Sequence, residues 1–115
     1  MLSSAKQLIE AGNFTQLEQV CETCEGIGRS QGLLGSTEAF AWFDQAAEIV
    51  KSLNNPPLRQ LQLLVSKQEV MMHTEPSSVS TIESLGRQAI ELAEQYGYHR
   101  HKEIVLDRLD MALNG

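Results

Sequence analysis

Long apolar runs and positive charge are what this sequence most lacks. No apolar run approaches the roughly 18 residues that a membrane-spanning helix needs, and residues 1–6 do not have the charged-then-apolar order of a secretory signal. Nine basic residues stand against fifteen acidic ones, which gives a formal net charge of −6. Such an excess of acid argues against general binding to a phosphate backbone. We therefore expect a cytoplasmic protein whose partners include neither a membrane nor a nucleic acid.

The sequence also lacks the alternation of apolar and polar residues that marks a half-buried strand. Apolar positions recur instead at spacings of three and four along almost the whole chain, which is the pattern of amphipathic helices. With 42% hydrophobic and 21% charged residues, the composition is that of an ordinary globular protein. A chain of 115 residues can bury one core. The sequence therefore predicts a single all-α domain over residues 1–115.

Local start and stop signals divide this domain into about six helices. Starts are predicted where a hydroxyl side chain can cap the first turn, and ends where Gly, Asn or Pro interrupts the helix. A glycine-rich segment, residues 26–35, is predicted to be a flexible connector that could move as a lid or hinge. The starts lie at Ser4, Thr15, Ser36, Pro56–Pro57 and Ser80, the ends at residues 11–13, 26–35, 54–57, 75–78 and 97, and a last apolar stretch spans residues 104–113.

A faint repeat runs through these helices. A shift of about 43 residues lays Gln45–Ile49 on Gln88–Leu92, and a period of that length is typical of stacked helical hairpins. Residues 89–97 resemble the second helix of a tetratricopeptide-like repeat with its closing glycine, and residues 9–14 resemble the turn inside another. The resemblance covers about two hairpins and implies a short solenoid of stacked antiparallel hairpins. A closed helical bundle is the alternative architecture.

Cys21 and Cys24 have the Cys-x-x-Cys spacing that redox pairs and zinc sites use. Both lie on the apolar stripe of the second helix, where free thiols act as small hydrophobic groups. We therefore expect a role in the core. The alternative is a small metal- or ligand-binding regulatory protein in which the two cysteines combine with His99 and His101.

Three groups of residues are candidate contacts for a partner. Acids of the second helix lie on one side of it and form either a solvated face or a docking surface for a basic partner. The basic segment 99–103 is either a solvated loop or, with a neighbouring tyrosine, a contact for an acidic segment. The third helix is the most apolar, and we expect it at the centre with its aromatic rings sandwiched; the alternative is that one ring faces a partner. The candidates are Glu18, Glu22, Glu25, Tyr98, His99, His101, Phe40, Trp42 and Phe43.

No spacing of Ser, His and Asp suggests a nucleophile held by a base, so we assign no catalytic, cofactor-binding or metal-ligating residue. The sequence predicts a non-enzymatic protein-interaction module: an adaptor, a small chaperone or a regulatory subunit. A peptide or helix of the partner would lie in a groove between helical hairpins. Because a short solenoid has exposed ends, self-association into a homo-oligomer is also expected.

Overall fold

The computed structural model describes residues 2–114, with side chains for residues 6–114. These residues form six α-helices and no strand, which confirms the all-α prediction. The helices are α1 (Leu2–Ala11), α2 (Phe14–Leu33), α3 (Ala39–Ser52), α4 (Pro57–Thr74), α5 (Val79–Tyr96) and α6 (His99–Asn114). No helix in this part of the chain is long and apolar enough to cross a bilayer.

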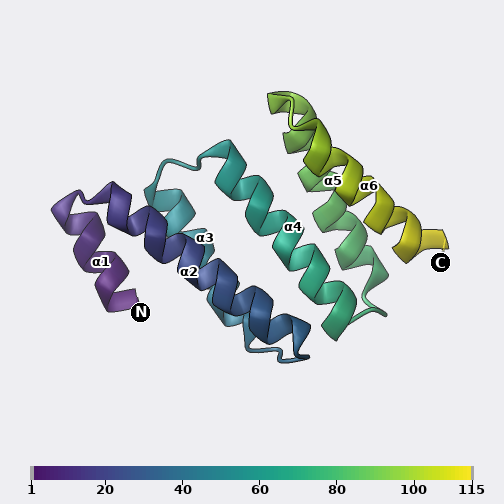
Figure 1. The fold of residues 1–115 in the computed structure, drawn as a ribbon, viewed down its shortest axis with the longest axis horizontal. Helices are drawn as coiled ribbons and strands as arrows, with labels where there is room; N and C mark the ends of the chain where they lie inside the picture. The colour runs from purple at the N-terminus through teal and green to yellow at the C-terminus, as the bar shows by residue number, and fades with distance from the viewer. Residues whose placement is uncertain (1, 115) are drawn as a thin grey trace.

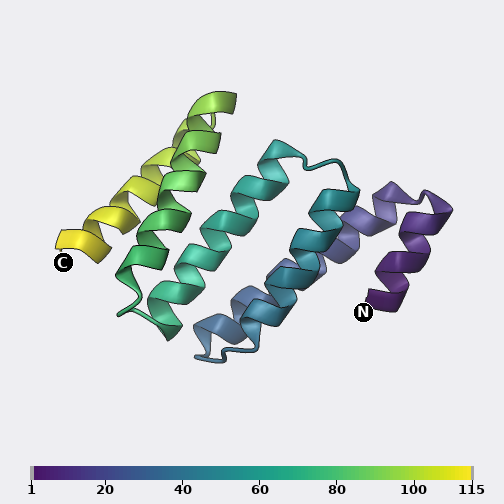
Figure 2. The same cartoon turned by 180° about the vertical axis from the view of Figure 1, so that it is seen from behind.

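The helices stack in an open row that measures 48 × 32 × 18 Å. α4 lies in the middle, with the α2–α3 pair on one side and the α5–α6 pair on the other (Figure 1). α2 and α6 are nearest the viewer in Figure 1, and α3 and α5 are nearest in the opposite view (Figure 2). α1 packs only against α2 and α3, and α6 only against α4 and α5. Since the first and last helices do not meet within residues 2–114, the helices form stacked hairpins and not the closed bundle of the alternative prediction.

α4 is the central helix because it contributes to two cores. Leu63 and Val70 join the core that α2 and α3 form, whereas Leu61 joins a second core with α5 and α6. Buried residues therefore lie on two sides of α4. We expected the more apolar α3 at the centre; the position of a helix in the row, and not its apolar content alone, decides how much of it is covered.

The glycine-rich segment is helical, so the predicted flexible connector, lid or hinge at residues 26–35 is wrong. α2 continues to Leu33, and two of its glycines, Gly28 and Gly32, lie at close crossings with neighbouring helices. A Cβ added at Gly28 would stand 3.0 Å from a ring carbon of Phe43, and one added at Gly32 would stand 2.9 Å from the Cβ of Val70. The absence of side chains at these positions lets α2 approach α3 and α4 closely, which outweighs the roughly 1 kcal/mol that each glycine costs in a helix.

The other turns lie where the sequence predicted helix ends, although some helices begin at other residues than predicted. Asn54 and Asn55 adopt positive φ angles of 64° and 52° between α3 and α4, a conformation that asparagine tolerates well. Gly97 ends α5 with φ 76°. α2 is capped by Asn13, whose side chain accepts a hydrogen bond from Gln16 N at 3.3 Å, so the predicted cap at Thr15 is wrong.

Candidate functional site

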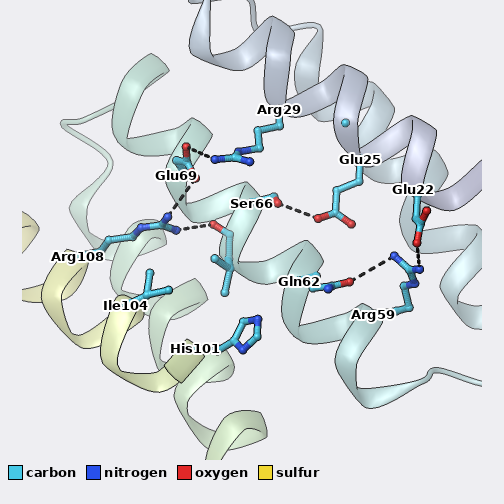
Figure 3. Close-up of a pocket in the computed structure, with 12 residues that line it drawn as sticks. Glu22, Glu25, Arg29, Arg59, Gln62, Ser66, Glu69, His101, Ile104 and Arg108 are labelled. Atoms are coloured by element: carbon cyan, nitrogen blue, oxygen red, sulfur yellow. Dashed lines mark hydrogen bonds and ion pairs between the residues drawn. The ribbon is translucent and has the colours of Figure 1, made fainter. Parts of the chain in front are cut away.

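The alternate helices α2, α4 and α6 run in the same direction and pair in a regular register. Ser66 of α4 bonds to Glu25 of α2, which lies 41 residues earlier, and Arg108 of α6 bonds to Val65 of α4, which lies 43 residues earlier. The facing surfaces of the three helices enclose an open groove with a volume of about 390 Å³ (Figure 3). Its walls are Glu22, Glu25, Gly26 and Arg29 of α2, Arg59, Gln62, Val65, Ser66 and Glu69 of α4, and His101, Ile104 and Arg108 of α6.

At one end of the groove, which we call the Glu69 end, one carboxylate is shared by two guanidinium groups. Arg29 Nη2 lies 3.2 Å from Glu69 Oε1, and Arg108 Nη2 lies 3.0 Å from Glu69 Oε2. Arg108 also donates from Nη1 to the carbonyl oxygen of Val65 at 2.9 Å. These contacts join all three helices (Figure 3). Because two positive charges meet one negative charge, this end is positive.

At the opposite end, the Arg59 end, the ratio is reversed. Arg59 donates from Nε to Glu18 Oε1 at 3.4 Å, from Nη2 to Glu22 Oε1, and from Nη1 to Gln62 Oε1 at 3.3 Å. Burial alone would lower the pKa of Arg59, but the hydrogen bond and charge of Glu22, with Glu18, raise it above its ordinary value. This guanidinium therefore stays charged, and two carboxylates around one cation leave this end negative.

Glu25 lies between the two ends and is half-buried. Its Oε1 accepts a hydrogen bond from Ser66 Oγ at 2.9 Å. Burial raises the pKa of Glu25, because a carboxylate loses hydration in the groove. The Ser66 hydrogen bond and the charges of Arg59 and Arg29 oppose that shift without cancelling it. A cation placed in the groove would therefore find an incompletely neutralised carboxylate here.

The α6 side of the groove is less charged than the other two sides. Ile104 contributes apolar surface, and His101 lines the groove beside it (Figure 3). The His101 ring meets the Tyr98 ring edge-on, with ring centroids 6.1 Å apart. Tyr98 is partly buried against the α5–α6 core, and His99 is exposed at the start of α6. Of these three predicted contacts, only His101 lines the groove.

Residues 99–103 form the first turn of α6, so the loop predicted for this segment is wrong. Successive residues of a helix point about 100° apart, which places His99 and His101 on nearly opposite sides. Cys21 and Cys24 are buried in the core between α2 and α3, as expected. Burial raises the pKa of the Cys21 thiol to about 11 and also raises that of Cys24. Within residues 2–114, the structure does not bring the cysteines and histidines into one metal-binding group.

The aromatic residues of α3 pack against the core and are not exposed for a partner. Phe43 is fully buried in the core, so the prediction that it contacts a partner is wrong. Its ring meets Phe40 edge-on, with ring centroids 6.3 Å apart. Phe40 and Trp42 are partly buried against the same core. None of the three rings lines the groove, because α3 lies on the other face of the row.

The acidic side chains of α2 lie close together, but the basic group that Glu18 and Glu22 contact is Arg59 of the same chain. Glu22 and Glu25 line the groove, and Glu18 reaches the Arg59 end through its ion pair. Sequence reasoning missed the arginines of the groove and Glu69. A signal was present: a shift of 40 or 41 residues sets Glu18 opposite Arg59. A shift of 40 residues likewise sets Arg29 opposite Glu69.

No model of a known protein family, no curated protein and no solved structure matches this chain. The tetratricopeptide-like resemblance therefore stays a prediction from the residues that carry it. The site is defined by the geometry of the groove.

Proposed function

We propose that this protein is a non-enzymatic protein-interaction module that holds a peptide segment of a partner in the groove between α2, α4 and α6. One observation carries the proposal: three parallel helices from successive hairpins enclose a groove of about 390 Å³, and charged, polar and apolar side chains converge on it. Concave sites on which a few polar groups converge are typical binding sites. An adaptor, a small chaperone or a regulatory subunit could each use such a groove.

The groove is suited to binding because its polar side chains are held in place before a partner arrives. Glu69 is fixed by two arginines, and Arg59 is fixed by Glu18, Glu22 and Gln62. Side chains that are already ordered lose less conformational entropy when a ligand binds, so more of the contact energy appears as affinity. The mixed charges would also select among partners, since like charges brought together lower affinity.

Gly26 offers a direct test, because it lines the groove and a Cβ added there meets no atom within 4 Å. A library of random dodecapeptides is displayed and selected against the folded chain, and the affinity of enriched peptides is measured by fluorescence anisotropy. We expect Gly26→Trp, which fills the groove without disturbing the core, to abolish their binding. The matched variant Gly26→Ala leaves the groove open and should bind as the original chain does. Peptides that bind both variants equally, or a library that yields no binders, would contradict the proposal.

A further inference from the structure

After the ion pairs of the groove have formed, one end still has free hydrogen-bond acceptors and the other still has free donors. At the Arg59 end, Glu18 and Glu22 each accept from Arg59 through Oε1, and Glu25, between the two ends, accepts from Ser66 through Oε1. The second oxygens of these carboxylates have no donor among the described residues. At the Glu69 end, Arg29 makes one ion pair within the described part of the chain, although a guanidinium has five N–H donors. One end therefore still accepts hydrogen bonds and attracts a cation. The other still donates them and attracts an anion.

The distance between the two ends follows from α4, which supplies a residue to each. Arg59 and Glu69 are ten residues apart, which is about 15 Å along a helix at 1.5 Å per residue. An extended chain, which rises about 3.3 Å per residue, spans that distance in four to five residues. This length sets the spacing of complementary charges in a ligand that reaches both ends.

The cross-section of the groove favours an extended segment over a helix. The volume of 390 Å³ is spread over about 15 Å of α4, which makes the groove slender. A helix is about 10 Å across with its side chains, so its backbone would stay above the floor of the groove. An extended backbone takes about 4.8 Å in width, the spacing of neighbouring strands, and fits with alternate side chains pointing out of the groove.

We propose that the partner segment is extended and bipolar: a Lys or Arg side chain lies at the Arg59 end, and an Asp or Glu side chain lies four or five residues away at the Glu69 end. An apolar residue between them packs on Val65 and Ile104, which line the middle of the groove. This inference rests on the proposed function, because it names the chemistry of the segment that the groove holds. A wholly basic segment would meet Arg29 and Arg108, and a wholly acidic one would meet the carboxylates of α2.

The chain offers substitutions that change one end and keep the fold. In Arg29→Gln, Glu69 keeps its ion pair with Arg108; in Glu22→Gln, Arg59 keeps its ion pair with Glu18. The control is Arg87→Gln, which removes one exposed positive charge from α5, outside the groove, where Arg87 pairs with a glutamate four residues earlier.

The experiment repeats the dodecapeptide selection on the original chain and on Arg29→Gln, Glu22→Gln and Arg87→Gln. The expected result is that peptides enriched on the original chain and on Arg87→Gln pair a basic with an acidic residue four or five positions apart. Selection on Arg29→Gln should lose the acidic preference, and selection on Glu22→Gln should weaken the basic one. For one enriched peptide, each groove variant should lower affinity by about fivefold. That loss should disappear when the peptide's matching charge is replaced by glutamine.

Three outcomes would overturn the inference, and they differ in what they mean for the function. Peptides that Gly26→Trp excludes but that show no preferred charge spacing would refute the bipolar segment and leave the groove as a peptide site. Failure of any peptide to bind in the groove would refute the proposed function and the bipolar segment together. A preference for helical peptides with charges about ten positions apart would also refute the extended conformation.

Discussion

Gly32 of α2 lies against Val70 of α4 so closely that no side chain fits between them. A Cβ at position 32 would stand 2.5 Å from Val70 Cγ2 and 2.9 Å from its Cβ. Val70 is fully buried and β-branched, so it has few alternative rotamers with which to move aside. The crossing of α2 over α4, which forms one side of the groove, depends on this missing side chain.

The first prediction compares two glycines of the same helix. Gly32→Ala should lower the free energy of unfolding by about 1–3 kcal/mol, because the added methyl group forces α2 and α4 apart. Gly26→Ala should raise it by about 0.5–1 kcal/mol, because that position is exposed and open and alanine favours the helix. Urea denaturation of both variants measures the difference. Equal effects of the two substitutions would show that the close crossing at Gly32 is absent.

These glycines illustrate which parts of the fold local sequence can predict. The break between α3 and α4 was predictable because Asn54, Asn55 and two prolines act on the backbone where they stand. At Gly32 local propensity and tertiary contact oppose each other, and the contact is with a residue 38 positions later. The local signal alone therefore ended the second helix too early.

The candidate site shows the same limit. The acids of α2 were identified from their spacing, since helical geometry alone puts Glu18, Glu22 and Glu25 on one side. Their partner Arg59 could be recognised only with the register between α2 and α4, which depends on how two hairpins stack. The full burial of Phe43 likewise follows from the glycine at position 28, which makes room for its ring.

The second prediction concerns the charge of Glu25. Since burial raises its pKa in the folded chain, the folded state holds the proton more tightly than the unfolded state. The stability linked to this group is present below the unfolded pKa of about 4.5 and falls as the pH rises through the folded pKa. Glu25→Gln should therefore be more stable than the original chain at pH 7, and the two should converge near pH 4.

Urea denaturation at several pH values tests this expectation. The amide oxygen of the substituted glutamine can still accept the hydrogen bond from Ser66, so the comparison isolates the charge. Glu103→Gln, at an exposed position of α6, serves as the control for a general change in net charge. A Glu25→Gln variant that is less stable at pH 7 would mean that attraction to Arg59 and Arg29 outweighs the loss of hydration.

The third prediction concerns the Cys21 thiol, whose pKa burial raises from 9.0 to about 11. At pH 8 the folded chain then holds about a hundredfold less thiolate at this position than the unfolded chain, and thiolate is the reactive form. In a Cys24→Ala variant, which leaves Cys21 as the single cysteine, iodoacetamide should label the folded chain about a hundredfold more slowly than the chain in concentrated urea. Labelling of the folded chain at the unfolded rate would contradict a buried thiol.

The same shift predicts a loss of stability in alkali. Well below pH 9 the Cys21 thiol is mostly protonated in both states, and its contribution changes little with pH. As the pH rises from 9 toward 11, the unfolded chain ionises first, so the free energy of unfolding falls. A Cys21→Ala variant should lack this part of the alkaline dependence, which urea denaturation at pH 8 and pH 10 would reveal.

The last prediction concerns Gln68, an amide in the interior of α4. It is 1% exposed, and its Oε1 has no hydrogen-bond partner among the described residues, while its Nε2 reaches Ile82 O at a weak 3.4 Å. A buried acceptor without a partner costs about 1–3 kcal/mol. Gln68→Met keeps the length and flexibility of the side chain and removes both polar atoms. It should raise the free energy of unfolding by about 1 kcal/mol.

The position of Gln68 makes this substitution a test of how tightly α4 packs against α5 and α6. Its Nε2 lies where a Cβ of Gly86 would come within 2.7 Å, beside Leu109 of α6, so a slender side chain is required there. The matched variant Gln68→Leu carries a branch that this space does not accommodate, and it should gain less stability than Gln68→Met. If both substitutions destabilise the protein equally, the amide of Gln68 is needed, either for its hydrogen bond to Ile82 O or for a water bound to its carbonyl.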